Sequence, residues 1–213
     1  MEIILIVTNR NISARHASKK AQPRNQGGFT LIEALIAFVI LSVGLLGIVS
    51  LQAMSKQSQH QAVQSARAVS MADDIVERIR INPGALLEYV TGTTPVSITP
   101  EPTPDCQATA CDPNELADHN LWAWQQTMEG AMITEGAAKA GGLINPKGCI
   151  LFTPLPGKVR TGLLNVIIQW QGLHSSTDAV QAGEVACGGA AATGDITRRQ
   201  VSVNTFVIDE QEL

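Results

Sequence analysis

The strongest pattern along the chain is an apolar run that starts at Phe29 and lasts until Lys56. It reads FTLIEALIAFVILSVGLLGIVSLQAMS, and Glu33 is its single charged residue. A helix needs about 20 apolar residues to cross a bilayer, so the run is long enough. Its large aliphatic residues and phenylalanines favour insertion by about 5 kcal/mol, against about 2.5 kcal/mol that a carboxylate costs at the bilayer centre. The pattern therefore predicts a transmembrane helix over residues 29–55.

Helical periodicity continues beyond this span as far as Pro83. No proline interrupts residues 29–81, and Asp74 precedes Arg78 by four residues, the favourable order for an ion pair along a helix. We expect residues 56–82 to be the soluble half of the same helix, with one face packed on a globular domain. That face is predicted from apolar residues at helical spacing, namely Ala62, Ala66, Val69, Val76 and Ile79.

Two glycines inside the span, Gly44 and Gly47, leave two interpretations open. Glycine lowers helix propensity, so the pair could loosen the helix. Small residues also let transmembrane helices pack closely, which is an equally good reason for their presence.

Residues 83–213 read as a globular domain with an exposed loop and a second helix. The loop is residues 91–105, which are rich in threonine and proline. The helix has a clear start, because Asp112 can cap it, Pro113 suits its first position and Glu115 completes a capping box. Gly136 is the expected end. Its apolar face is predicted from spacings of three and four residues: Ala117, Leu121, Trp124, Met128 and Met132.

Three apolar segments near the end of the chain are predicted strands, over residues 149–153, 161–171 and 200–208. In the second, Leu164, Val166, Ile168 and Trp170 alternate with polar residues; in the third, Val201, Val203, Thr205 and Val207 share a face. A long helix followed by strands predicts an α+β fold with an antiparallel sheet packed on that helix. Residues 173–197 are rich in glycine and alanine and are expected to form a long loop.

Charge is segregated along the chain. The net charge is -4, and aromatic residues make up 4% of the chain, so nothing favours nucleic-acid binding. Residues 1–28 are basic, however, and by the positive-inside rule they should stay cytoplasmic while everything after Lys56 lies outside. A secretory signal peptide fits poorly, because the apolar run is too long and no A-x-A site follows. The basic residues are Arg10, Arg15, Lys19, Lys20 and Arg24.

A plain signal anchor explains the span but not the junction before it. The residues Gly28-Phe29-Thr30-Leu31-Ile32-Glu33 resemble the cleavage and methylation motif of the type IV pilin superfamily. That resemblance implies that a prepilin peptidase/methyltransferase removes residues 1–28 after Gly28 on the cytoplasmic side and methylates the new amino terminus at Phe29. It also implies a pilin-like fold.

Glu33 then becomes the fifth residue of the mature chain. The new amine adds positive charge to a helix end that already carries unpaired N–H groups. Glu33 can partly neutralise its own helix end, or meet the amine of a neighbouring subunit in a filament, which relieves its poor solvation in lipid. The competing interpretation is that Glu33 merely marks the interfacial end of the span.

Further segments are similar to the PilV-type minor pilins, also called type IV pilus modification proteins. They are residues 40–47 (ILSVGLLG), 51–52, 73–83 (DDIVERIRINP) and 121–126 (LWAWQQ). The resemblance implies a minor pilin that primes or modifies pilus assembly. Its expected partners are other minor and major pilins, the inner-membrane assembly platform and membrane lipid. It would lie in the bacterial inner membrane with its C-terminus in the periplasm, and later in the pilus at the cell surface. The alternative is a minor pseudopilin of a type II secretion system.

The four cysteines lie on the side of the span that is expected to be oxidising. They allow three pairings, and we favour Cys106 with Cys111 and Cys149 with Cys187, because the short loop pairs locally and leaves the other two. A zinc site is the rival, although no C-x-x-C occurs and no histidine clusters with the cysteines in sequence.

No catalytic motif is present, and neither an enzyme nor a cofactor nor a bound metal is expected. H-E-x-x-H, G-x-S-x-G and a phosphate-binding loop are all missing from the sequence. The histidines His60, His119 and His174 are predicted to face solvent. The acids Asp105, Asp112 and Asp118 are interpreted as turn, cap and solvated-face residues.

Overall fold

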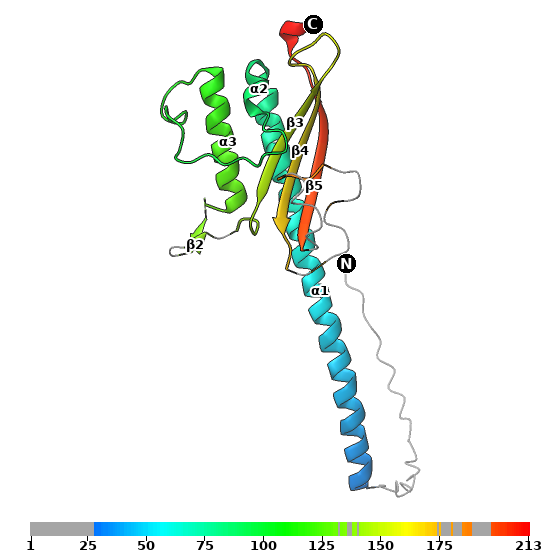
Figure 1. Cartoon of the computed structure of the whole chain (residues 1–213). Coiled ribbons are helices and arrows are strands. Elements are labelled where there is room, and N and C mark those ends of the chain that lie inside the picture. Colours follow the sequence, from blue (N-terminus) through cyan, green and yellow to red (C-terminus); the bar gives the residue numbers. More distant parts are fainter. Residues whose placement is uncertain are drawn as a thin grey trace, which may run out of the picture. The chain divides into compact units, whose positions relative to one another are not determined.

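The computed structural model describes residues 28–131, 133–135, 138, 139, 141–173, 175, 180, 185–188 and 197–213. Helix α1 spans Leu31–Arg80, close to the predicted range, and ends just before Pro83 as expected (Figure 1). The chain divides into two compact units, residues 1–50 and 51–213, so the first part of α1 belongs to one unit and the rest to the other. Each unit is described separately below.

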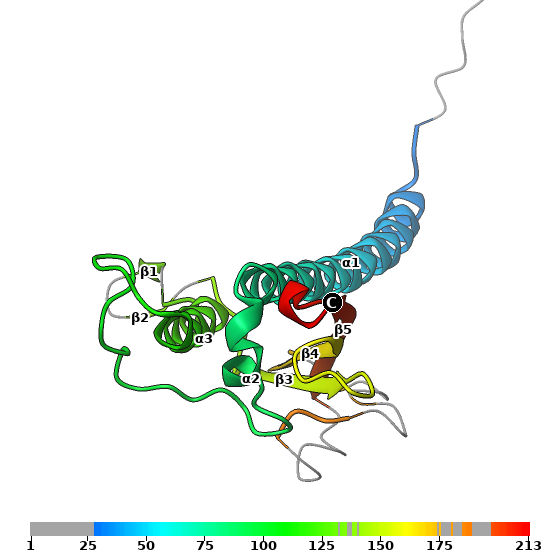
Figure 2. The ribbon, with the colours of Figure 1, turned by 90° about the horizontal axis from the view of Figure 1, so that it is seen from above.

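The second unit has the predicted α+β class. After α1 come a 3₁₀ turn η1 (Pro83–Ala85), α2 (Leu86–Tyr89), α3 (Pro113–Glu129), the short strands β1 (Thr134–Glu135) and β2 (Ala138–Lys139), the longer strands β3 (Lys147–Pro154), β4 (Gly162–Gln171) and β5 (Arg198–Val207), and η3 (Glu210–Glu212). Strands β3, β4 and β5 form an antiparallel sheet in that order (Figures 1 and 2). The three predicted strands each lie within two residues of these bounds.

The sheet presents one apolar face to the helices. Val166, at the centre of β4, pairs with Ile150 of β3 and Val203 of β5. The predicted inner residues of β4, Leu164, Val166, Ile168 and Trp170, are all buried. The predicted face of β5 is partly covered and Val207 is fully buried, so the alternation in the sequence identified the correct side of both strands.

The second part of α1 packs through a face that was only partly predicted. Val76 and Ile79 are buried as expected, but Ala62, Ala66 and Val69 are exposed. Alanines recur at helical spacing on two sides of this segment, and periodicity alone could not tell which side is covered. The face that packs consists of Gln64, Ala68, Ala72, Ile75, Val76 and Ile79.

Helix α3 begins where the sequence predicts and ends earlier. Asp112 accepts hydrogen bonds from the backbone N–H groups of Asn114 and Glu115, and the Glu115 carboxylate accepts from the Asp112 N–H, completing the capping box. The predicted end at Gly136 is wrong. The helix stops at Glu129, because Gly130 adopts the left-handed conformation (φ 72°) and closes the last turn. Met132 and Gly136 lie outside the described residues.

The threonine- and proline-rich loop has no regular structure, as predicted, but part of it is held against the core. The Val96 N–H donates to the Gly148 carbonyl (2.8 Å), and the Ile98 N–H donates to the Gln125 side chain of α3 (2.7 Å). Val96 and Ile98 are therefore half-buried rather than exposed.

Gly148 allows α3 to lie close to β3. A Cβ added there would lie 2.5 Å from the ring of Trp124, well inside van der Waals contact. Trp124 in turn donates from Nε1 to the Met71 carbonyl of α1 (2.8 Å). A single buried indole thus connects α1, α3 and the sheet.

Candidate processing and assembly site

The predicted cleavage junction lies just before α1. Gly28, Phe29 and Thr30 have no helical structure and are exposed, and Phe29 has 84% of its surface accessible. A peptidase needs access to a segment of backbone that is not locked into a helix. Gly28 and Phe29 meet that condition, while residues 1–27 of the predicted leader lie outside the described residues.

Thr30 fixes the helix start, a role that the sequence analysis did not assign. The Glu33 N–H donates to the Thr30 hydroxyl (3.3 Å) and carbonyl (3.1 Å), and the Ala34 N–H donates to the same carbonyl (3.2 Å). Thr30 and Glu33 form a Thr-x-x-Glu pattern, which is a sequence signature of a helix N-terminus. This cap places Glu33 in the first turn of α1.

The Glu33 side chain is exposed, and it makes no hydrogen bond or ion pair with any residue that the structure describes. Its carboxylate lies near the helix N-terminus, where unpaired N–H groups favour a negative charge. An exposed carboxylate of this kind is available to a positive group on another molecule.

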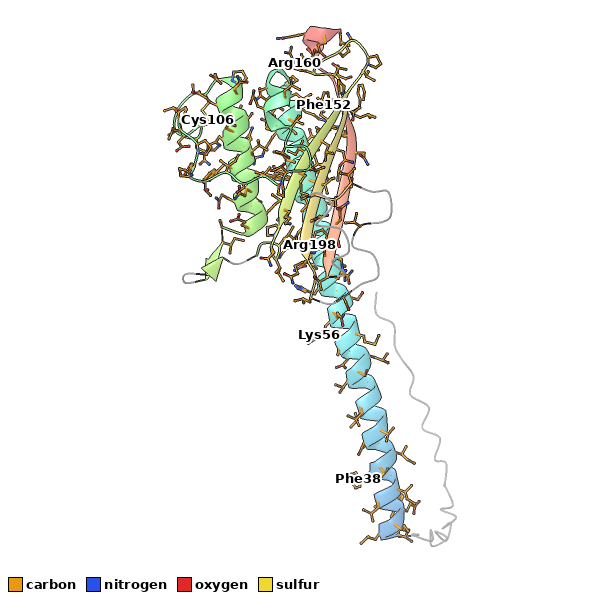
Figure 3. The ribbon with its side chains drawn as sticks, viewed as in Figure 1. Phe38, Lys56, Cys106, Phe152, Arg160 and Arg198 are labelled. Carbon is orange, nitrogen blue, oxygen red and sulfur yellow. A yellow bond between two sulfur atoms is a disulfide. The ribbon has the colours of Figure 1, made fainter. Side chains whose placement is uncertain are left out.

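Every residue from 28 to 63 is exposed, including the whole apolar run. Figure 3 shows side chains projecting from α1 around Phe38. By length and composition α1 is sufficient to cross a membrane. Monomeric soluble proteins rarely expose apolar surface on this scale, so this surface is suited to contact with lipid or with other helices. The large apolar residues concerned are Phe29, Leu31, Ile32, Leu35, Ile36, Phe38, Val39, Ile40, Leu41, Val43, Leu45, Leu46, Ile48, Val49, Leu51 and Met54.

The two glycines of this region do not interrupt the helix. α1 is continuous through Gly44 and Gly47, and a Cβ added at either would meet nothing within 4 Å. Neither glycine is therefore required by contacts within the described chain. Both glycines leave space in which another helix can approach α1 closely.

Both disulfides have the predicted pairing. Cys106 is joined to Cys111 and Cys149 to Cys187, each with a Cα–Cα distance of 5.5 Å, and no cysteine is free. The cysteine zinc site considered as a rival is thereby removed. The second disulfide covers the outer face of the sheet, where Cys149, Ile167 and Cys187 form a small buried cluster.

The histidine prediction is partly wrong. His60 is exposed as expected, and His174 lies outside the described residues. His119 instead has only 4% of its surface accessible. Position 119 of α3 faces the loop that carries Glu101 and Asp105, and a solvent-facing interpretation ignored that covering loop. Asp112 is the helix cap and Asp118 is exposed, as predicted.

Two models of protein families match the chain in adjoining stretches. The prokaryotic N-terminal methylation motif matches residues 23–49, and the family described as type IV pilin Tt1218 matches residues 50–122. The first includes Gly28, Phe29 and Glu33, and such a motif implies processing by a prepilin peptidase. No curated protein and no solved structure matches the chain significantly.

Proposed function

We propose that this chain is a type IV pilin-family subunit with a structural rather than an enzymatic role, and that it works as a PilV-type minor pilin that primes or modifies filament assembly. Residues 1–28 are the leader removed by the prepilin peptidase, and Phe29 becomes the methylated amino terminus. Residues 29–55 span the inner membrane, and the second half of α1 with the α+β domain lies in the periplasm. After assembly the protein is part of the pilus.

One observation carries the proposal: the Glu33 carboxylate lies in the first turn of α1 without a partner among the described residues, in an apolar stretch where every residue from 28 to 63 is exposed. In lipid, Glu33 is poorly solvated, and a partner of opposite charge offsets that cost. Cleavage after Gly28 supplies such a partner, because each mature subunit gains an amine at Phe29. Within one helix the amine and Glu33 are close, and between bundled helices the amine of one subunit meets Glu33 of the next.

The minor pilin role is favoured over the pseudopilin role by sequence outside the shared amino terminus. Residues 40–47, 51–52, 73–83 and 121–126 resemble PilV-type sequences. Pseudopilins of type II secretion share the processing motif but serve protein export, so the two roles differ in which machine fails without the protein.

A strain that lacks the gene for this chain distinguishes the minor pilin role from the pseudopilin role. Loss of surface pili with normal secretion, restored by the wild-type gene, is the expected result. Loss of secretion with normal pili would assign the chain to the secretion system instead. Quantitative mass spectrometry of sheared pili should find this chain at a small fraction of the major pilin; equal or greater abundance would exclude a minor subunit.

A further inference from the structure

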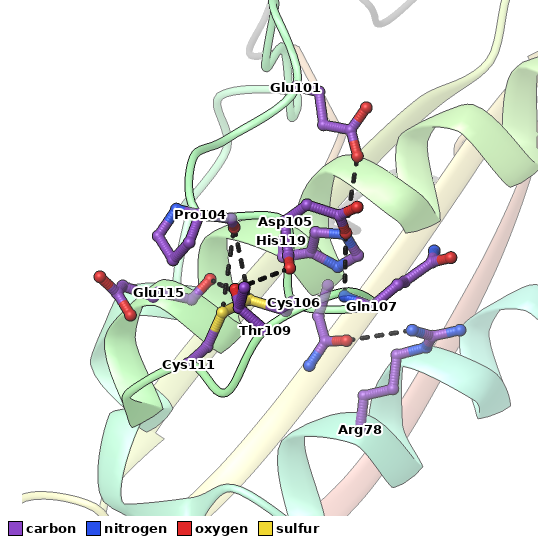
Figure 4. A network of polar contacts seen from close by, with 11 residues as sticks. Arg78, Glu101, Pro104, Asp105, Cys106, Gln107, Thr109, Cys111, Glu115 and His119 are labelled. Atoms are coloured by element: carbon purple, nitrogen blue, oxygen red, sulfur yellow. Dashed lines mark hydrogen bonds and ion pairs between the residues drawn. A yellow bond between two sulfur atoms is a disulfide. The ribbon is translucent and has the colours of Figure 1, made fainter.

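The loop before the first disulfide and helix α3 bring together three side chains that can bind a metal ion. The Nε2 atom of His119 lies 3.6 Å from the Asp105 carboxylate and 3.8 Å from the Glu101 carboxylate (Figure 4). One possible ligand atom from each residue falls within 4.8 Å of the other two. His119 belongs to α3, whereas the two acids come from a loop with no regular structure, so the fold itself creates this group.

The buried imidazole lacks a partner. The His119 side chain is 6% exposed, and its Nε2 atom has no hydrogen-bond partner among the described residues. Both carboxylates are beyond hydrogen-bonding distance. A buried polar nitrogen left without a partner costs about 1–3 kcal/mol, and such groups need an explanation. Nε2 lies 3.6 and 3.8 Å from the two carboxylates, so a cation between them would be within reach of this nitrogen.

The two carboxylates lack a positive partner of their own. No lysine or arginine forms an ion pair with Glu101 or Asp105 in the described part of the chain. Arg78 lines the same hollow as His119, but its guanidinium is engaged by Asp74 (2.9 Å) and Asn120 (3.0 Å). Two acids and one imidazole therefore converge, and no lysine or arginine among the described residues compensates the charge of the acids.

We propose that Glu101, Asp105 and His119 form a binding site for a divalent first-row transition-metal ion, with Zn²⁺ as the best fit. Tetrahedral ligands about 2.0–2.2 Å from zinc lie about 3.3–3.6 Å from one another. The Nε2 atom of His119 lies 3.6 and 3.8 Å from the two carboxylates, close to that range. Imidazole with carboxylates suits zinc, whereas calcium and magnesium prefer oxygen ligands alone. Both acids are exposed, so small rotations of their side chains are enough to complete the geometry.

The surroundings hold the loop in position for this role. Asp105 accepts from the Gln107 N–H (2.9 Å), and the Cys106–Cys111 disulfide closes the chain directly after it. Cys106 Sγ lies 3.7 Å from the Glu115 carbonyl of α3, so the loop contacts the helix beside His119. His119 also lines a hollow together with Gln107 and Trp122, from which water can supply a fourth ligand. The ion would fasten this loop to α3.

Calorimetric titration of metal-free, full-length protein in detergent with zinc chloride at neutral pH tests the site. One equivalent of Zn²⁺ should bind, and Glu101→Gln, Asp105→Asn and His119→Gln should each weaken binding at least tenfold. Asp118→Asn, an exposed acid beside His119, and His60→Gln, an exposed histidine of α1, are the matched controls and should bind as the wild type does. X-ray absorption should show nitrogen and oxygen neighbours at about 2.0 Å and no sulfur.

Failure of the wild type to bind zinc would overturn the proposal, and so would unchanged binding in both carboxylate variants or a sulfur neighbour. Because His119 is buried, its variant could fail to fold; Glu101→Gln and Asp105→Asn change exposed side chains and decide the matter without it. Hydrogen exchange of the loop gives a further test. If lowering the pH without metal protects the loop from exchange and adding zinc does not, the metal site is overturned in favour of an ion pair between His119 and the acids.

Discussion

Helix α1 contains two apolar segments that differ in what covers them. Residues 31–50 belong to the first unit and are exposed on every side, whereas between Gln64 and Ile79 one face is buried against the core of the second unit. Both are continuous α-helix with no proline, so local propensity does not separate them. The second segment obtains its stabilisation from packing within the chain. The first has no such packing among the described residues, and in the proposed function lipid or other subunits cover it.

The largest effect of a substitution is expected at Glu33, the one charged residue among residues 31–50. Glu33→Val should still be cleaved and inserted, but should fail to enter filaments, because the neighbouring amine loses its partner. Immunoblots of sheared filaments and of membranes measure the two steps. Asp73→Val, at an exposed acid in the covered half of the same helix, is the control and should assemble. Normal incorporation of Glu33→Val would remove the pairing argument.

The two disulfides should differ in their contribution to the second unit. Cys149–Cys187 closes a loop with a sequence separation of 38 residues, and Cys106–Cys111 one of 5. In the chain-entropy model these closures stabilise the fold by about 4 and about 2 kcal/mol. Paired cysteine-to-alanine variants, compared by urea unfolding, should follow that order. Equal losses, or a larger loss from the short loop, would contradict it.

A matched pair of isoleucines tests the contrast in packing directly. Ile75 is fully buried, while Ile40 is 67% exposed. Ile75→Ala should lower the free energy of unfolding of the second unit by about 2–5 kcal/mol, because it leaves a cavity. Ile40→Ala should leave that free energy within about 0.5 kcal/mol of the wild type. A comparable loss in both variants would mean that the uncovered segment is also packed within the monomer.

The smallest effect concerns acids at the far end of the second unit. Hydrogen bonding from the Gln211 N–H and from Arg160 lowers the pKa of Asp209 below its usual 3.8. Burial acts to raise the pKa of Glu212, but hydrogen bonds from Arg160, Thr161 and Val159 outweigh it and lower that pKa below 4.5. Because the pKa of each carboxyl is lower in the folded than in the unfolded chain, both ionised carboxylates stabilise the fold when the pH is above their unfolded-state pKa. That stabilisation is lost as the pH falls through the folded-state pKa.

Urea midpoints measured between neutral pH and pH 3 should therefore fall slightly further in the wild type than in Asp209→Asn, which lacks one of the two acids. Parallel curves for the two proteins would show that Asp209 makes no such contribution. Glu210→Gln serves as the control, because Glu210 is an exposed neighbour whose side chain makes no hydrogen bond or ion pair with the residues that the structure describes.

Much of this architecture follows from local sequence. Asp112, Pro113 and Glu115 act within one helical turn, and the inner residues of β4 and β5 follow from the period of two along a strand. Such features depend on neighbours in the chain, so they are readable without a structure. The junction at Gly28 and Phe29 is likewise a short contiguous motif.

Two features that the sequence does not predict depend on partners distant in sequence. Which face of α1 is covered depends on where the sheet and α3 pack. Ala68 and Ala72 are buried, whereas Ala62 and Ala66 are exposed. His119 is buried because a loop preceding its helix folds over it, and no spacing within α3 reveals this. The early end of α3 has a local cause, because Gly130 adopts the left-handed conformation before the predicted end at Gly136 is reached.

The most direct test of the account is the amino terminus of the mature protein. Mass spectrometry of the chain purified from cells that contain an active prepilin peptidase should find a first residue of Phe29, with one methyl group on its amine. A chain that retains residues 1–28, or one that begins within or beyond the apolar run, would contradict processing at this junction and with it the assignment of α1 to a filament.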